Sequence, residues 1–237
     1  MRYRPGYPPE ILDVLREKCG LTPSAQIVDI GFGTGLFTRL LLENGNPVTG
    51  VEPNPEMRQA GERFLAEFPR FRALQGTAEA TTLENHSVDF VTAAQAAHWF
   101  DREGARREFQ RILKPAGWVV LLWNERITDS TPFLLAYEEL LLKYGTDYAE
   151  VRHERTTAII GEFFEPSPYE LATFPMRQMF DLPSLEGRAF SSSYTPQPGE
   201  ANYEPLRREL GDLFRRCQTV GQVAFEYWTR VFFGRLS

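Results

Sequence analysis

The stretch VDIGFGTGLFT, Val28 to Thr38, decides the fold of this chain. An apolar run leads into three glycines at alternate positions, Gly31, Gly33 and Gly35, and an amphipathic run follows. This order predicts a strand, a tight turn and a helix, with backbone N–H groups open to a ligand. The dinucleotide fingerprint would need its third glycine at Leu36, so the turn favours a nucleotide-like ligand without a pyrophosphate.

A carboxylate stands at the end of the next predicted strand. The run PVTGV leads directly into Glu52, at about the 20-residue distance from the glycine turn that dinucleotide folds use. An acid at that strand tip can accept both hydroxyl hydrogens of a ribose. The alternative is that Glu52 caps the turn at Pro53 and Asn54. We favour the ribose role because the glycine turn lies at the matching distance.

Short apolar runs alternate with helical patterns through the first half of the chain. Strands are predicted at residues 25–30, 47–51, 71–75, 87–93 and 118–123. Helices are predicted at residues 10–18, 36–43, 55–67 and 101–113, the last stopped by the KPAG turn at 114–117. This order indicates an α/β protein with a parallel sheet covered by helices on both faces.

The second half breaks this rhythm. Helices are predicted at 131–144, 156–164 and 203–217, and strands at 169–180 and 223–233. We interpret the pattern as a helical insertion after the fifth strand, followed by a strand–helix–strand closure. The proline-rich run at 194–205 is predicted to be a surface connector.

Composition restricts the partners and the compartment. The 237 residues carry a net charge of −6, which disfavours nucleic acid as a partner. The basic run at 207–216 is predicted to be the solvated face of a helix rather than an RNA-binding patch. No apolar run suits a bilayer, and the first residues lack a secretory signal. With two cysteines far apart, we expect neither a disulfide framework nor a metal cluster, and a cytoplasmic location.

The motifs together resemble those of class I S-adenosylmethionine-dependent methyltransferases. The resemblance covers residues 25–125 and rests on VDIGFGTG, VTGVEPNPEM, LQGTAEATTL, VDFVTAAQAAHWFD and RILKPAGWVVLLW. The flanking runs RYRPGYPPEI and FEYWTRVFFGRL resemble the small-molecule branch of methyltransferase type 11 proteins, which includes trans-aconitate methyltransferase-like proteins.

The resemblance implies a Rossmann-like, doubly wound sheet of seven strands, mostly parallel, with an antiparallel last strand. It also implies one domain over 1–237. Its parts are an N-terminal arm and helix at 1–20, a cofactor-binding core at 25–125, a helical lid at 126–168 and the closing strand–helix–strand at 169–237.

The cofactor site that the resemblance implies follows the strand ends. It comprises Asp29, Gly31, Phe32, Gly33, Thr34, Gly35, Glu52, Pro53, Thr77, Ala78, Glu79, Ala94 and Gln95. Asp29 and the glycine loop would face the methionine part of S-adenosylmethionine, and Glu52 would bind its ribose, with Pro53 beside the adenine. Ala94 and Gln95 would flank the transferred methyl group.

The adenine contact is where this chain departs from the family. The backbone N–H of Ala78 would face a ring nitrogen of the adenine. The family usually has an aspartate where this chain has Thr77. This difference weakens the expected contact to the adenine amino group, and whether Glu79 replaces the aspartate stays open.

Candidates for the acceptor side lie near the same edge. His98 is a candidate general base or hydrogen-bond donor to the substrate, and the alternative is a structural histidine that caps the following helix. Trp99 is a candidate wall of the pocket, and the alternative is a core residue. The remaining substrate candidates come from the N-terminal arm and the end of the fifth strand: Tyr3, Arg4, Tyr7, Trp123, Asn124 and Arg126. An arginine fork in the arm suits a carboxylate, although chain ends also fray.

The sequence therefore predicts a methyltransferase that transfers a methyl group by in-line displacement to a small molecule, with a carboxylic acid as the candidate acceptor. A carboxylate nucleophile needs no general base, so a catalytic residue is not required. The alternatives are a non-catalytic cofactor-binding module and a methyltransferase that acts on a protein. A nicotinamide-dependent oxidoreductase is disfavoured by Leu36. No zinc pattern or magnesium ligand pair is present, so no metal is expected.

Overall fold

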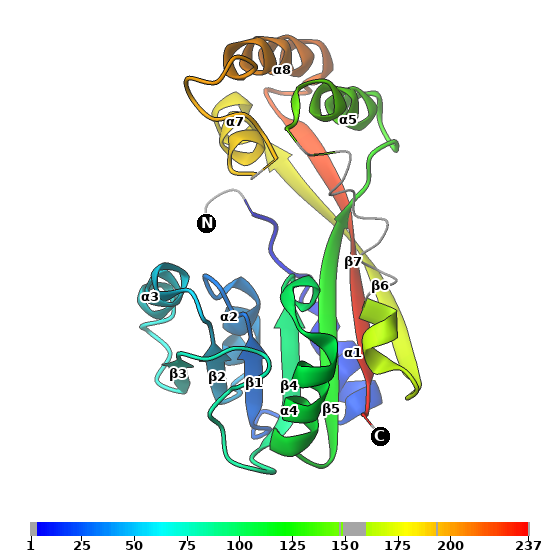
Figure 1. The fold of residues 1–237 in the computed structure, drawn as a ribbon. Coiled ribbons are helices and arrows are strands. Elements are labelled where there is room, and N and C mark those ends of the chain that lie inside the picture. The colour runs from blue at the N-terminus through cyan, green and yellow to red at the C-terminus, as the bar shows by residue number, and fades with distance from the viewer. Residues whose placement is uncertain (1–3, 147, 149–159, 193, 237) are drawn as a thin grey trace. The chain divides into compact units, whose positions relative to one another are not determined.

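The structure of the protein is a computed structural model that describes residues 4–146, 148, 160–192 and 194–236 (Figure 1). Its helices and strands are α1 (Glu10–Cys19), β1 (Ile27–Ile30), α2 (Leu36–Glu43), β2 (Val48–Val51), α3 (Pro55–Phe64), β3 (Phe71–Leu74), β4 (Val88–Ala94), the 3-10 helix η1 (Ala97–Trp99), α4 (Arg102–Ile112), β5 (Leu113–Arg126), α5 (Pro132–Tyr144), β6 (Tyr169–Phe180), α7 (Leu182–Phe190), α8 (Tyr203–Cys217) and β7 (Val223–Gly234).

The chain divides into two compact units. Unit 1 comprises Met1–Pro5, Glu125–Glu154 and Pro175–Trp228. Unit 2 comprises Gly6–Asn124, Arg155–Phe174 and Thr229–Ser237, and so contains β1 to β4, most of β5 and helices α1 to α4.

Seven strands form one sheet in the order β3-β2-β1-β4-β5-β7-β6. The neighbours from β3 to β5 are all parallel, whereas β7 runs against them (Figure 1). The predicted α/β class, the mostly parallel seven-stranded sheet and the antiparallel last strand are confirmed. Helix α5 and the helical residues 160–164 lie in sequence between β5 and β6, as the predicted helical insertion requires.

The central strands of the sheet in unit 2 are buried on both faces, as in parallel sheets covered by helices, whereas the edge strand β3 is only partly buried. Val28 and Ile30 of β1 point to one face, where they join a cluster with Phe109 of α4. Ile27 points to the other face, where its cluster includes side chains of α1 and α2 such as Leu41. Each fully buried side chain of this size contributes about 1.5–3 kcal/mol, so the two clusters fix the register of the strands.

Unit 1 has a core of its own, rich in aromatic side chains. Phe133 and Tyr137 of α5 lie against Phe225 of β7, with ring centroids 5.6 and 4.8 Å apart. Side chains of α7 and α8, among them Leu185 and Leu210, are fully buried in the same cluster.

Two predicted features differ locally from the structure. Helix α3 ends at Phe64 rather than at residue 67. The KPAG turn does end the preceding helix, but it lies inside the span of β5 as an irregularity. Val88 pairs with Leu113 and Phe90 with Trp118, so the four residues 114–117 of β5 stand opposite the single residue Asp89 of β4. Of the predicted helix 156–164, residues 156–159 lie outside the described residues.

Helix α7 is absent from the sequence-based prediction. Asp181 caps it, because its Oδ1 accepts a hydrogen bond from the backbone N–H of Ser184 at 2.9 Å, and Pro183 lies in the first turn. An aspartate before a proline is a known helix-start signal. The helix is nine residues long, which left little periodicity to detect.

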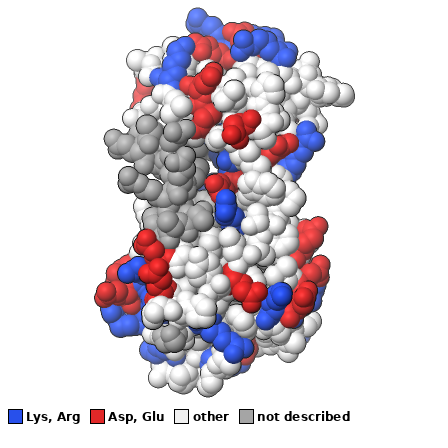
Figure 2. Space-filling model, turned by 90° about the vertical axis from the view of Figure 1, so that its right-hand side faces the viewer, with Lys and Arg blue, Asp and Glu red and all other residues white. Residues whose placement is uncertain are grey.

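The charged surface agrees with the predicted solvated face of α8. Its arginines at 207, 208, 215 and 216 are exposed. On the face that Figure 2 presents, basic and acidic side chains are intermixed. Within the described part of the chain, no helix combines the length and the apolar character needed to cross a membrane.

Candidate functional site

The glycine loop between β1 and α2 adopts a backbone conformation that other residues avoid. Gly31, Gly33 and Gly35 have φ values of +66°, +56° and +88°, in the region that glycine occupies readily. A Cβ atom at Gly31 would lie 2.6 Å from Cβ of Ala96, and one at Gly35 would lie 2.7 Å from Cδ1 of Leu65. The loop is therefore shaped by close packing as well as by backbone freedom. Gly35 also begins α2 without a side-chain cap.

Phe32, between the first two glycines, anchors the loop to the core. Its ring fills space above two further glycines, since a Cβ at Gly50 or at Gly61 would lie 2.5 Å from the ring. The ring also packs edge-on against Phe71 at 5.4 Å, and the residue is 6% exposed. The side chain of this predicted cofactor residue is thus part of the core, and only its backbone contributes to the glycine loop.

Glu52 connects the glycine loop with the start of α3. Its Oε2 accepts a hydrogen bond from the Gly33 N–H at 3.0 Å, and its Oε1 accepts one from the Asn54 N–H at 3.0 Å. Asn54 in turn caps α3 by accepting from the N–H groups of Glu56 and Met57. The turn contact named as an alternative role of Glu52 is therefore present.

That contact leaves the ribose role of Glu52 open. A carboxylate offers about four lone-pair positions, and the two backbone bonds take one on each oxygen. Each oxygen keeps a position for a ligand hydroxyl. The residue is 8% exposed, so a hydrogen bond here would form largely out of water. Pro53 beside it is exposed. Ribose binding stays a prediction.

Asp29, at the carboxyl end of β1, is held entirely by hydroxyl groups. Thr38 of α2 donates to its Oδ2 at 2.6 Å, and Thr92 of β4 donates to its Oδ1 at 2.8 Å. The residue is 1% exposed, and burial raises its pKa from 3.8 to about 6 despite these two bonds. The nearby charge of Glu52 raises it further. Asp29 thereby positions the loop by joining β1, α2 and β4.

This raised pKa makes the stability of the protein depend on pH in a defined direction. The folded chain holds the Asp29 proton more tightly than the unfolded chain, so its contribution is present below pH 3.8 and is lost as pH rises to about 6. The difference between the pKa values of Asp29 in the folded and the unfolded chain corresponds to a stability contribution on the order of 3 kcal/mol, at about 1.4 kcal/mol per pKa unit. We expect the free energy of unfolding of Asp29→Asn, minus that of the wild type, to increase between pH 4 and pH 7. Urea denaturation at several pH values measures this difference in the free energy of unfolding. A difference that does not change with pH would show that the Asp29 carboxyl has an ordinary pKa.

The segment predicted to edge the adenine forms a tight turn after β3. The Thr77 N–H donates to the Ala80 carbonyl at 3.2 Å, and the Ala80 N–H donates back to the Thr77 carbonyl at 3.3 Å. Ala78 within the turn is 4% exposed. Glu79 Oε1 accepts from the N–H of Asp101 at 2.9 Å, ahead of α4. Its carboxylate therefore ties this turn to α4 through one oxygen, and its replacing the missing aspartate stays a prediction.

At the end of β4, Gln95 has a φ of +59°, which is uncommon for a residue other than glycine. The conformation is fixed by two bonds to β5. Its N–H donates to the Leu122 carbonyl at 3.0 Å, and its Nε2 donates to the Asn124 carbonyl at 3.3 Å. Strained backbone of this kind concentrates at functional sites. The preceding Ala94 is half-buried.

Asn124 connects three segments of unit 2 through hydrogen bonds of its side chain. Its Oδ1 accepts from the Thr229 hydroxyl at 2.6 Å, and its Nδ2 donates to the Gly6 carbonyl at 3.1 Å. The residue is 6% exposed. This predicted substrate residue thus connects the segment before α1 with the middle of β7. Tyr7 is half-buried and packs edge-on against Phe37 at 5.1 Å.

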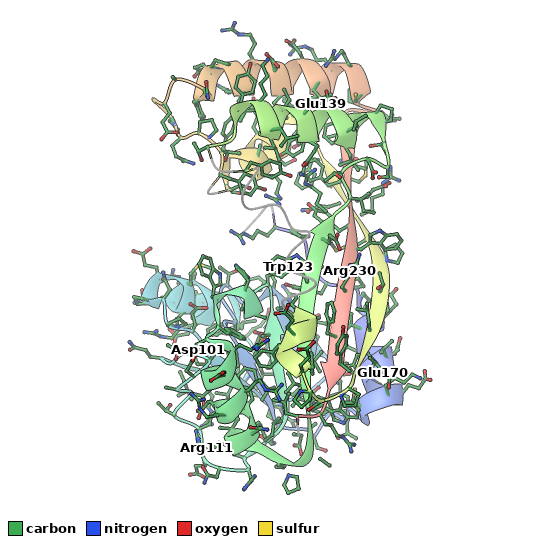
Figure 3. The ribbon with its side chains drawn as sticks, turned by 45° about the vertical axis from the view of Figure 1, so that its right-hand side comes forward. Asp101, Arg111, Trp123, Glu139, Glu170 and Arg230 are labelled. Carbon is green, nitrogen blue, oxygen red and sulfur yellow. The ribbon has the colours of Figure 1, made fainter. Side chains whose placement is uncertain are left out.

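His98 lies in η1 among aromatic rings. Its ring centroid is 4.7 Å from that of Trp99 and 5.1 Å from that of Trp123, which it meets edge-on. His98 is exposed and Trp99 is 80% exposed, whereas Trp123 is 6% exposed. Figure 3 shows Trp123 on β5 and Asp101 at the start of α4. Asp101 caps α4 by accepting from the Gly104 N–H at 3.1 Å.

The other candidates belong to unit 1 or lie outside the described residues. Arg126 is buried within unit 1, where it pairs with Glu138 at 2.5 Å. Arg4 belongs to unit 1 and is exposed. Tyr3 lies outside the described residues. The site residues that the structure brings together in unit 2 are thus the glycine loop, Glu52, the turn after β3 and the end of β4.

The sequence did not indicate the residues that contact Asp29 and the glycine loop from neighbouring elements. Thr38, Thr92 and Ala96 contact Asp29 or Gly31 across distances of 9, 63 and 65 positions in the chain. Thr38 carried a weak signal, because it lies in the first turn of the helix that the loop opens. Thr92 and Ala96 carried none. No group of three or more metal-ligating side chains suited to a metal ion occurs in the part of the chain described.

The matches to known proteins include the regions that form the candidate site. A family model described as a methyltransferase domain matches residues 28–121, from β1 to β5. An uncharacterized methyltransferase-like protein of Schizosaccharomyces pombe is 30% identical over 234 residues, which cover 97% of this chain and 89% of that protein.

Two solved structures share the fold. A candidate type II methyltransferase of Anaeromyxobacter dehalogenans is 21% identical, with a TM-score of 0.73 and 98% of each chain covered. A phosphoethanolamine N-methyltransferase of Haemonchus contortus, solved with S-adenosyl-L-methionine, is 15% identical, with a TM-score of 0.52 over 95% of this chain and 52% of that chain. The strand order, the glycine loop and the near full-length relative agree, and the chain belongs to the class I S-adenosylmethionine-dependent methyltransferases.

Proposed function

We propose that the glycine loop and Glu52 of this chain bind S-adenosylmethionine, and that the protein methylates a small molecule that carries a carboxylate. The observation that carries the cofactor site is the bond from the Gly33 N–H to Glu52 Oε2 at 3.0 Å. It brings the loop backbone and the carboxylate to one point at the carboxyl ends of β1 and β2. Ligands of open α/β sheets bind at this edge.

The residues present fit the cofactor. Gly31 and Gly35 let the loop backbone pack against Ala96 and Leu65 at distances that a Cβ would not allow, and this packing sets the path of the loop beside Glu52. Glu52 keeps one lone-pair position on each oxygen for the two ribose hydroxyls. When bound, S-adenosylmethionine supplies an electrophilic methyl group. The protein then has to hold the acceptor in line with that group and to exclude water.

The acceptor class rests on two arguments. The flanking motifs resemble the branch that includes trans-aconitate methyltransferase-like proteins, and the net charge of −6 disfavours RNA. A carboxylate is nucleophilic without losing a proton, so this acceptor needs no general base. We further propose a cytoplasmic location. A protein acceptor and a non-catalytic binding module are the competing functions.

Transfer of labelled methyl groups separates these functions. The protein is incubated with methyl-labelled S-adenosylmethionine and separate sets of carboxylic acids, amines, phenols and cytosolic proteins. We expect label in an ester of a small carboxylic acid, which base hydrolysis releases. Label in protein would favour the protein acceptor. Binding of the cofactor without label in any set would favour the non-catalytic module.

His98 offers a test of how the acceptor is handled. We expect His98→Ala to lower turnover on the best acceptor by about 10- to 100-fold, because the acceptor carboxylate would lose a positioned hydrogen-bond donor, and a bond to a charged group contributes about 1.5–3 kcal/mol. Its affinity for S-adenosylhomocysteine should stay within about twofold of the wild type. His86→Ala is the control, because His86 is exposed and bonds the Leu113 carbonyl at 2.8 Å, away from β4's end. Unchanged turnover in His98→Ala would make His98 a structural residue.

A further inference from the structure

The core of unit 1 contains two arginine side chains, and the first of them is paired. Arg126, at the end of β5, is 7% exposed. Its Nη2 donates to Glu138 Oε2 at 2.5 Å and lies 2.7 Å from the Tyr148 hydroxyl. Tyr148 also donates to Glu138 Oε2, at 2.6 Å. The guanidinium lies over the rings of Tyr137 and Phe225, 5.1 and 6.0 Å from their centroids. Glu138 thus balances the charge of Arg126.

The second arginine has no such counter-charge in the described part of the chain. Arg188 of α7 donates from Nη1 to the Ser192 hydroxyl at 3.0 Å. Its electrostatic neighbours are the hydroxyls of Tyr137, Tyr194 and Tyr227. It forms no ion pair with a carboxylate of the described residues. Because Tyr137 and Tyr227 feel the charge of both arginines, the two guanidinium groups belong to one cluster.

The tyrosines cannot supply the missing negative charge. Burial raises the pKa values of Tyr137 and Tyr227, so both hydroxyls stay neutral at physiological pH. The cluster of Arg126, Arg188 and Glu138 therefore carries one surplus positive charge. Two of its donors, Nη1 of Arg126 and Nε of Arg188, are buried and have no hydrogen-bond partner among the described residues.

A buried cation without an anion and buried donors without acceptors both cost free energy. One group removes both costs. A carboxylate carries a single negative charge, and its two oxygens match the planar donor fork of a guanidinium. Arg188 and Tyr194 are half-buried, so parts of both residues reach solvent. We propose that Arg126 and Arg188, with Tyr137, Tyr194 and Tyr227 around them, form a binding site in unit 1 for the carboxylate of a small organic acid.

A monoanion fits better than a phosphate dianion for two reasons. The surplus charge is one, and the surroundings are aromatic rings rather than further cations. The aromatic side chains suit the apolar part of an organic acid. The assignment of this acid as the methyl acceptor rests on the proposed function. The site itself lies wholly within unit 1, and its test does not need the cofactor.

Calorimetric titration of the full chain tests the site with succinate, tricarballylate and benzoate as probes. Succinamide and inorganic phosphate serve as the neutral and the dianionic comparison. We expect at least one carboxylate to bind with a millimolar or lower dissociation constant, and succinamide not to bind. Arg188→Gln should weaken that binding at least tenfold. Arg208→Gln is the matched control, because Arg208 is exposed on α8 of the same unit.

Two further readouts separate a binding role from a structural one. Arg188→Gln removes an uncompensated charge and leaves the pair of Arg126 with Glu138 intact, so the melting temperature without ligand should not fall. A clear fall would mean that Arg188 holds the fold and would contradict the proposal. Phosphate binding as tight as that of the carboxylates would overturn the assignment to an organic acid.

The same samples are titrated with S-adenosylhomocysteine. If S-adenosylhomocysteine binds and no carboxylate does, the carboxylate site is refuted and the cofactor site stands. If carboxylates bind in an Arg188-dependent way and S-adenosylhomocysteine does not, the unit 1 site stands and the proposed function fails.

Discussion

A single methyl group at Gly31 is expected to lower the free energy of unfolding by about 2–5 kcal/mol and to abolish measurable cofactor binding. The added Cβ would lie 2.6 Å from Cβ of Ala96, and neither atom can rotate away because both are fixed to backbone. Overpacking of this kind costs about 1–3 kcal/mol. The φ of +66° adds about 1–2 kcal/mol for a residue with a side chain. Relief of the collision would displace the loop from Glu52. Urea denaturation and titration with S-adenosylhomocysteine measure the two effects.

Two companion variants isolate the collision. Gly33→Ala carries a similar φ of +56°, but its Cβ would lie 3.4 Å from Cε of Met57, the flexible end of a side chain. Its free energy of unfolding should fall only by the cost of the backbone strain, about 1–2 kcal/mol. The double variant Gly31→Ala with Ala96→Gly removes the collision and should recover the overpacking part. Equal stability of Gly31→Ala and the wild type would refute the close approach of the loop to Ala96.

Removal of the Glu52 carboxylate is expected to weaken S-adenosylhomocysteine binding by about 10- to 100-fold. Hydrogen bonds to a charged group contribute about 1.5–3 kcal/mol, and 1.4 kcal/mol is a factor of ten in affinity. Glu52→Ala also frees the N–H groups of Gly33 and Asn54, so the loop loses a support together with the ribose acceptor. Calorimetric titration of the variant measures the loss.

Two variants make this result specific. Glu56→Ala is the control, because Glu56 is an exposed acid at the start of α3, and its affinity should stay within about twofold of the wild type. Glu52→Gln keeps one acceptor oxygen but turns an amide N–H₂ toward a backbone N–H, so its loss should be intermediate. Wild-type affinity in Glu52→Ala would remove the ribose assignment.

The local sequence pattern was sufficient to predict most of the fold, because the central strands of unit 2 are largely apolar on both faces and sharply bounded. Gly31 and Asn54 marked the ends of β1 and β2, and the helices that follow begin at the predicted residues, Leu36 and Pro55. Helix α7 lacked such a pattern, because nine residues that include Pro183 and Gly187 carry little helical periodicity.

The backbone of the candidate site could be predicted in the same way, but the direction of its side chains could not. Phe32 points into the core because Gly50 and Gly61 leave room for its ring, and both are distant in the sequence. Asn124 is held by Gly6 and Thr229, at opposite ends of the chain. Arg126 follows Asn124 by two residues and yet joins the core of unit 1. These outcomes depend on partners that only the folded chain brings together.

Calorimetric titration of the wild-type protein with S-adenosylhomocysteine tests the central claim most directly, because it needs no knowledge of the acceptor. If the glycine loop and Glu52 form the cofactor site, binding will be one-to-one with a dissociation constant in the micromolar range. Absence of binding at millimolar S-adenosylhomocysteine would contradict the account, since the loop would then serve another ligand or none.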